Sequence, residues 1–141
     1  MSFLDIDTSD AVEPSCVPGD IEYKVRIIAY REKEDEEGKL NKILINQNGE
    51  PYISPIFEIP SEPTSKDFNT YIPLPHNDMD PKTLAKAKWR LEEFKRCFNI
   101  PQGRVDLANT IGNEGYVILG LKEDPQYGEQ NFIKKMIVPK R

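Results

Sequence analysis

Apolar and polar residues alternate most clearly between Ile21 and Arg31, and again between Tyr116 and Leu121. A period of two indicates a strand that buries one face and exposes the other. In the first segment the expected inward face consists of Ile21, Tyr23, Val25, Ile27 and Ala29, and the outward face of Glu22, Lys24, Arg26, Ile28 and Tyr30. A last strand, in which apolar and basic residues are mixed, is expected from Phe132 to Pro139.

Shorter apolar runs predict further strands between these segments. Leu40 to Ile45 and Tyr52 to Ile59 are separated by Asn48-Gly49, a pair that tolerates positive φ and therefore favours a chain reversal. Pro55 has no backbone donor for a ladder, so we expect a sheet edge or a bulge there. Phe68 to Leu74 predicts one more short strand.

One segment has the spacing of a helix. Leu91, Phe94 and Phe98 recur at intervals of three and four, which places them in one apolar stripe. Asp80 followed by Pro81 suits the cap and the first turn of that helix. We expect this helix to bury its stripe against the strands and to close one end of a barrel.

The expected elements run strand-strand-strand-helix-strand-strand, which is the order of the OB-fold. We therefore predict a mainly β fold with one principal helix, an OB-fold-like five-stranded Greek-key barrel, over residues 21–141. Residues 1–20 are expected to form an acidic N-terminal leader that ends in the turn Pro18-Gly19-Asp20. Phe3, Leu4 and Ile6 give this leader apolar side chains that could pack against the barrel.

Charge is distributed unevenly along the chain. The formal net charge is -5, and the leader alone holds five acids without a basic residue. The rest is formally neutral, with local basic stretches in the expected helix and last strand; such patches govern attraction to phosphates at short range. No apolar run approaches the ~20 residues of a membrane span, and no secretory signal is visible, so we expect a cytoplasmic protein.

Residues that commonly carry catalysis are sparse. The single histidine, His76, has no nearby nucleophile, and Cys16 and Cys97 are far apart in sequence. No phosphate-binding glycine motif or metal-ligand spacing is present. We therefore expect a protein that is not an enzyme, has free thiols and uses no cofactor or metal.

Aromatic and basic residues on outward strand faces indicate binding of single-stranded nucleic acid. Aromatic rings stack on bases, and cations follow the phosphate backbone. The predicted binding residues are Lys24, Arg26, Tyr30, Tyr52, Tyr71, Phe132, Lys134 and Lys135. The alternative for each tyrosine is an ordinary position in the core or at the rim of a small barrel.

Six short blocks carry a resemblance to a known family. They are Met1-Ser2-Phe3-Leu4-Asp5-Ile6-Asp7, Pro18-Gly19-Asp20-Ile21-Glu22-Tyr23-Lys24-Val25-Arg26-Ile27, Phe57-Glu58-Ile59-Pro60, Trp89-Arg90-Leu91-Glu92-Glu93-Phe94, Ile111-Gly112-Asn113-Glu114-Gly115 and Tyr127-Gly128-Glu129-Gln130-Asn131. These blocks resemble bacteriophage single-stranded DNA-binding proteins. The resemblance implies an OB-like barrel that coats single-stranded DNA during phage DNA replication or recombination in the host cytoplasm, with replication or recombination proteins as further partners.

Two alternatives stay open at this point. Many single-stranded DNA-binding proteins end in an acidic tail, whereas this chain ends in Pro139-Lys140-Arg141 and is acidic at its start. The acidic leader could instead occupy a basic groove until DNA displaces it. The chain could also be a protein-interaction module that contacts a replication or virion partner and no nucleic acid. Self-association is compatible with either function.

Overall fold

The computed structural model describes residues 1–139, which contain ten strands and two helices. The strands are β1 (Ile21–Tyr30), β2 (Lys33–Glu34), β3 (Leu40–Asn41), β4 (Leu44–Ile45), β5 (Pro51–Ile53), β6 (Pro55–Glu58), β7 (Phe68–Asn69), β8 (Ile72–Pro73), β9 (Glu114–Asp124) and β10 (Gly128–Met136). The helices are α1 (Pro81–Cys97) and the 3-10 helix η1 (Leu107–Thr110). Neither helix has the length and apolar character needed to cross a membrane. Lys140 and Arg141 lie outside the described residues.

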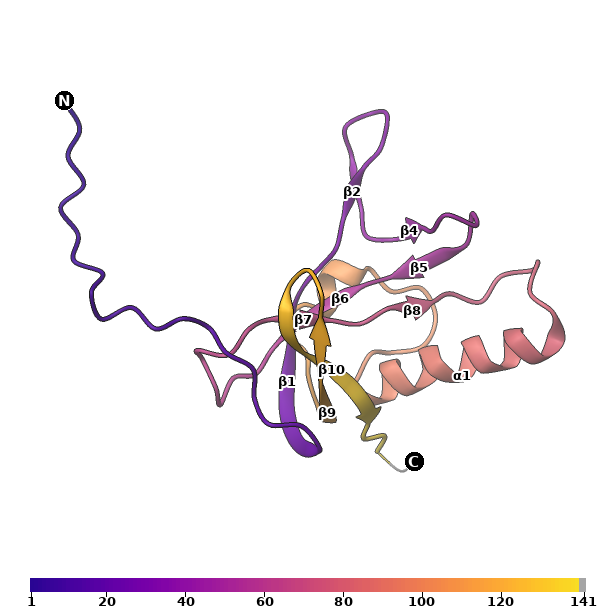
Figure 1. Ribbon diagram of the computed structural model, residues 1–141. Helices are drawn as coiled ribbons and strands as arrows, with labels where there is room; N and C mark the ends of the chain where they lie inside the picture. The colour runs from indigo at the N-terminus through magenta and orange to yellow at the C-terminus, as the bar shows by residue number, and fades with distance from the viewer. Residues whose placement is uncertain (140–141) are drawn as a thin grey trace.

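Five antiparallel strands form the main sheet, in the order β10-β9-β1-β6-β7. Its two edge strands, β7 and β10, lie next to each other, so the sheet is a nearly closed barrel. A smaller sheet has the order β4-β5-β8, and the β2-β3 hairpin projects from the body as an arm (Figure 1). The expectation of a mainly β fold with one principal helix is confirmed.

Two predicted strands are each divided between the two sheets. The chain pairs as β5 in the small sheet, passes Ser54 and then pairs as β6 in the barrel, where the buried Pro55 is the first residue. Phe68 to Leu74 was expected to be one strand, but β7 pairs with β6 in the barrel and β8 pairs with β5. The expected reversal at Asn48-Gly49 is confirmed as the turn between β4 and β5, with Gly49 at a φ of 77°.

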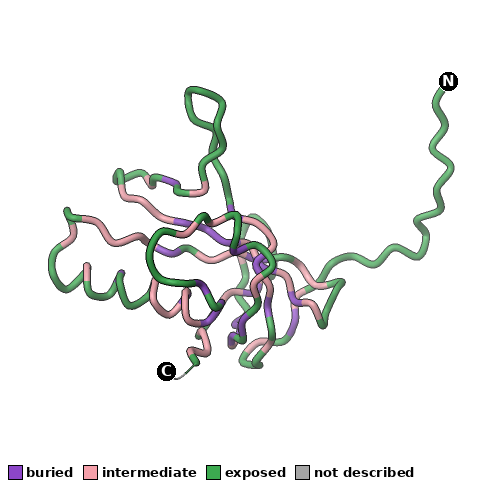
Figure 2. Tube along the Cα trace, turned by 180° about the vertical axis from the view of Figure 1, so that it is seen from behind, coloured by how far each residue is buried: buried purple, intermediate pink, exposed green. Residues whose placement is uncertain are grey.

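The core lies between the barrel strands and the C-terminal half of α1. Phe98 is fully buried, and its ring centroid lies 5.3 Å from that of Phe57 and 5.3 Å from that of Phe94. Figure 2 shows the buried segments gathered at this junction. Asp80 caps α1 by accepting a hydrogen bond from the Thr83 backbone N–H at 2.8 Å. The predicted cap and apolar stripe of this helix are therefore confirmed.

A bulge in β1 overturns one predicted site residue. The register of β1 against β6 shifts between Ile27 and Ala29, which inserts an extra residue and reverses the facing of the residues that follow. Tyr30 consequently points inward and is 4% exposed, and its hydroxyl forms a hydrogen bond with the Thr110 hydroxyl. The prediction that Tyr30 lies on the binding surface is wrong, because uninterrupted alternation was assumed.

A second bulge changes the facing of residues in β10. The register against β9 shifts between Ile133 and Lys135. Ile133 and Met136 both pack against the core, whereas Phe132 lies opposite Gly120 on the outer face. Uninterrupted alternation would place Phe132, Lys134 and Met136 on one face, but the bulge separates Phe132 from Met136.

The N-terminal segment joins the body before the boundary that the sequence suggested. Val17 is buried, and the Asn131 side chain holds its backbone, accepting from Val17 N and donating to Val17 O, both at 3.0 Å. Ser15 pairs with Ser65 in an isolated bridge. Residues 1–14 extend away from the body (Figure 1), and their apolar side chains, which could have packed against the barrel, are exposed.

The end of α1 lies directly against β9. A Cβ atom at Gly115 would lie 2.5 Å from the Cys97 carbonyl oxygen, so this position needs glycine for the close approach of the two backbones. The Cys97 thiol is buried there and donates to the Tyr116 carbonyl at 3.4 Å. Burial raises the pKa of Cys97 to about 11.

This shift predicts a loss of stability at alkaline pH. The thiol has a pKa of 9.0 in the unfolded chain and about 11 in the folded protein. The contribution of the buried neutral thiol to stability is therefore complete below about pH 9, and it is lost as the pH rises toward 11. The free energy of unfolding should fall over that range by up to about 2–3 kcal/mol more than in a Cys97→Ala variant. Urea denaturation at several pH values measures the difference. Equal pH dependence in both proteins would contradict it.

Candidate nucleic-acid interface

A groove follows the outside of the barrel where β7 and β10 approach each other, beside α1. Its larger part, about 440 Å³, is lined by Asn69, Thr70, Tyr71, Pro73, Arg90, Lys122, Phe132 and Ile133. An adjoining part of about 150 Å³ is lined by Thr70, Arg90, Glu93, Ile133, Lys134, Lys135 and Met136. Because Thr70, Arg90 and Ile133 line both parts, they form one continuous feature, which we call the seam groove.

Tyr71 forms one aromatic wall of the seam groove, and its ring packs against Tyr52. Tyr71 is 45% exposed, and its ring centroid lies 4.5 Å from that of Tyr52 at an interplanar angle of 30°. The Tyr71 hydroxyl accepts from Asn46 Nδ2 at 3.0 Å, and Arg90 donates to the Tyr71 carbonyl at 2.9 Å. These contacts hold an exposed aromatic face in a fixed orientation.

Phe132 provides an aromatic ring on the opposite wall. It lies across from Gly120 of β9, and a Cβ atom at position 120 would come within 2.4 Å of the ring. The ring therefore lies over the backbone of β9, where any other residue would displace it. Lys122 Nζ lies 5.7 Å from the ring centroid and adds a positive charge beside the aromatic surface.

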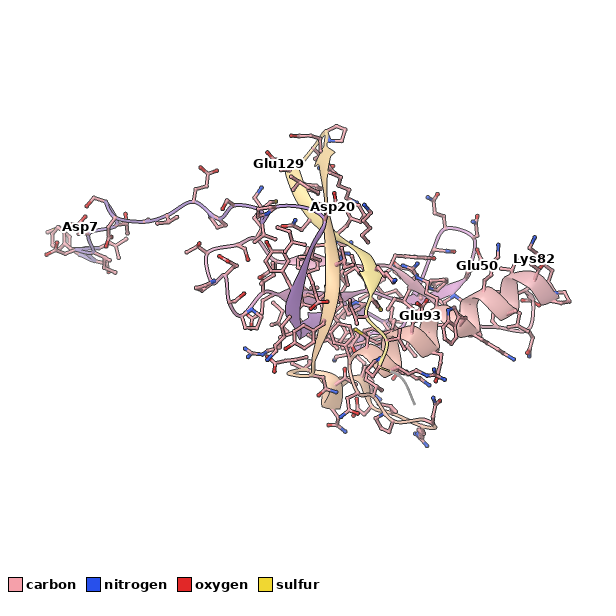
Figure 3. All side chains as sticks on the ribbon, turned by 90° about the horizontal axis from the view of Figure 1, so that it is seen from below. Asp7, Asp20, Glu50, Lys82, Glu93 and Glu129 are labelled. Carbon is pink, nitrogen blue, oxygen red and sulfur yellow. The ribbon has the colours of Figure 1, made fainter. Side chains whose placement is uncertain are left out.

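Basic side chains outnumber acidic ones along the groove. The groove is lined by the basic residues Arg90, Lys122, Lys134 and Lys135 and by the acidic residue Glu93. Lys134 Nζ lies 2.6 Å from Asp20 Oδ1, but both side chains are largely exposed, so water screens this pair. Figure 3 labels Asp20 just before β1 and Glu93 on α1. The groove therefore offers positive charge between two aromatic walls.

Two predicted site residues lie away from the seam groove. Lys24 and Arg26 are on the outer face of β1, the central strand of the sheet, whereas the groove lies where the sheet edges meet. Arg26 forms salt bridges of 3.0 Å with both Glu58 and Glu114, so its charge is compensated. Lys24 Nζ lies 5.7 Å from the ring centroid of Tyr116. The expected single surface is thus divided between two faces.

The remaining predicted residues meet at the groove. The groove is lined by Tyr71, Phe132, Lys134 and Lys135. The Tyr52 ring packs against the Tyr71 ring.

Two further groove residues, Arg90 and Lys122, were not predicted from the sequence. Lys122 follows Gly120 by two positions in an alternating strand, a pattern that could have marked both as outward-facing. Arg90 reaches the groove only because α1 packs beside β8, which no local pattern indicates.

The described residues contain no group of three or more histidine, cysteine or acidic side chains placed to hold a metal ion. His76 has its Nε2 atom 3.5 Å from Glu50 Oε2 and accepts from the Asp78 backbone N–H through Nδ1 at 3.3 Å. These contacts fold the loop before α1 and lie apart from the residues that line the seam groove. Neither a scan against protein-family models nor a search of curated proteins finds a match to the chain.

Proposed function

We propose that this chain is a non-enzymatic single-stranded DNA-binding protein with an OB-like barrel. The strand order supports the fold: β1 lies between β6 and β9, and α1 comes after the third barrel strand and before the fourth. The resemblance to phage proteins supports a role in coating single strands during phage DNA replication or recombination. Little sequence preference is expected, because every base has a face that can stack.

The observation that carries this proposal is the arrangement of side chains in the seam groove. Tyr71 and Phe132 present aromatic surface on its two walls, and Arg90, Lys122 and Lys135 place cations between and beside them. Stacking contributes about 1–3 kcal/mol per base, and the cations neutralise phosphates. The groove follows the curved surface of the barrel, an arrangement that suits a flexible single strand better than a stiff duplex.

A binding titration tests the function directly. We would titrate the protein into a fluorescently labelled oligo-dT strand and into a duplex of equal length, at low and at near-physiological salt, and record anisotropy. The proposal expects tight, salt-sensitive binding to the single strand and weak binding to the duplex. Absence of binding to either, by protein shown to be folded, would overturn it.

The salt dependence of binding should identify the cations that contact phosphates. Replacing Lys134 and Lys135 together by alanine should lower the slope of log affinity against log salt by about 0.7 for each phosphate that is no longer neutralised. Lys24→Ala is the matched control, because Lys24 lies on the outer face of β1 beside Tyr116. A slope that is unchanged in the double variant, or reduced as much in the control, would remove these lysines from the site.

A protein-interaction module is the second candidate function. Leu40, Ile43 and Ile45 are between 54% and 63% exposed at the base of the arm, and the formal net charge is -5. Exposed apolar clusters commonly mark protein contacts. Stoichiometric recovery of one replication, recombination or virion protein after nuclease treatment, together with no DNA binding in the titration, would favour this function.

A further inference from the structure

The segment formed by residues 1–14 presents large apolar side chains without packing them. Phe3 is 84% exposed, Leu4 86% and Ile6 69%. The hydrogen bonds of this segment are local, as between the Ser9 N–H and Asp7 Oδ1, and the first backbone contact with the body is at Ser15. The segment also carries four acids and no lysine or arginine. An acidic, apolar peptide of this kind can become ordered when it binds a complementary surface.

An apolar pocket on the body has the matching character. It is about 150 Å³ in volume, and its walls include Ile43 at the base of the arm, Leu74 after β8, Leu91 of α1, and Val105 and Leu107 near η1. An apolar cavity of about this volume can hold a benzene ring, so one phenylalanine or leucine side chain fits. A shallower depression of about 280 Å³ shares Ile43, Val105 and Leu107, which gives room for a second apolar side chain.

Charge at the pocket complements the acids of the segment. Lys95 is the charged residue among those that line the pocket, and it forms no salt bridge within residues 1–139. Asp5 and Asp7 flank Ile6, so a peptide that inserts Phe3 or Ile6 brings a carboxylate close to the pocket rim. The pocket and the segment therefore match in size, in apolar character and in sign of charge.

The segment and the pocket lie on opposite sides of one molecule. All three views show residues 1–14 leaving the barrel on the side away from α1 (Figures 1, 2 and 3). The pocket lies between α1, the base of the arm and the loop that leads to η1. Residues 3–7 lie 8 to 12 positions before the anchor at Ser15, so in an extended chain they reach roughly 26–42 Å beyond the body. The segment can therefore reach a second molecule.

We propose that residues 3–7 of one copy bind the apolar pocket of a second copy. Such a contact joins two different surfaces and leaves a free segment at one end and a free pocket at the other, so it builds head-to-tail chains rather than closed dimers. This self-association goes beyond DNA binding and does not require it. Along a bound strand, it would hold neighbouring barrels together.

Two complementary variants of the full chain test the contact without DNA. A segment variant carries Phe3→Ala and Ile6→Ala and keeps the pocket, whereas a pocket variant carries Ile43→Asp and Lys95→Glu and keeps the segment. Ile43 is 54% exposed and Lys95 is only partly buried, so both variants should fold, which circular dichroism would verify. Sedimentation velocity at several concentrations measures the size of the assemblies.

The wild-type chain should show weight-average mass that rises with concentration, and each variant alone should associate at least about tenfold more weakly, as when an interface anchor is truncated. Mixing the two variants in equal amounts should give complexes of two copies and no longer chains. A wild-type chain that stays monomeric, or association that neither variant weakens, would overturn the proposal. A wild type that forms only closed dimers would overturn the head-to-tail arrangement.

Discussion

Replacing Tyr71 or Phe132 by alanine is expected to weaken binding of single-stranded DNA by roughly 5- to 150-fold for each residue. The expectation follows from the removal of one stacking platform, worth about 1–3 kcal/mol per base. Both rings line the seam groove from opposite walls. Because neither substitution removes a cation, the slope of log affinity against log salt should stay the same while the affinity falls. Anisotropy titrations with oligo-dT at several salt concentrations measure both quantities.

Tyr116→Ala is the matched control for this experiment. Tyr116 is 49% exposed, close to the 45% of Tyr71, but it lies opposite Lys24 on the outer face of β1 and β9. Its removal should leave DNA affinity within about twofold of the wild type, as expected for a side chain outside the site. If Tyr116→Ala weakened binding as much as Tyr71→Ala, the DNA would follow the face of β1 and the seam groove would not be the site.

The largest effect on stability is expected from Phe98→Ala. This side chain is fully buried where α1 ends, between the rings of Phe57 and Phe94. Removing a buried phenylalanine costs about 3–5 kcal/mol, because less apolar surface is buried and a cavity remains. Urea denaturation should show this destabilisation as a lower midpoint with a similar slope.

A control on the same helix separates packing from helix propensity. Trp89 is 51% exposed and contacts Arg96 through its ring face at 5.5 Å, so Trp89→Ala should cost no more than about 1 kcal/mol. If Phe98→Ala were as mild as Trp89→Ala, the helix would not carry the core contacts described for it. Stability would then have to reside in the strands alone.

The helix could be predicted from the sequence because its determinants are local. Asp80, Pro81 and the stripe of Leu91, Phe94 and Phe98 lie within one segment and act on their own turns. The strands of the barrel could be predicted in part for the same reason, since alternation marks inward and outward residues. The bulges after Ile27 and Ile133 could not be predicted, because they depend on partner strands that lie far away in sequence.

The candidate site was predictable in composition but not in position. Tyr71 and Phe132 were identified as outward aromatic residues, yet only the strand order places them on facing walls. Lys24 has the same local pattern and lies on the central strand, far along the sheet from its edges. Pairing between distant segments decides which strand becomes an edge. The edge strands therefore could not be predicted from the local patterns of a single sequence.

The strand order also bears on how the chain folds during its synthesis. β1 pairs on one side with β6, which follows soon after it, but on the other side with β9, and Val17 is held by Asn131, 114 residues away. The barrel can close only when β10 has left the ribosome, and pairings of such high sequence separation form slowly. Until then, the core around Val25 and Ile27 of β1 is incompletely covered. Newly made chains are therefore vulnerable to aggregation, and chaperone supply would influence the yield of folded protein.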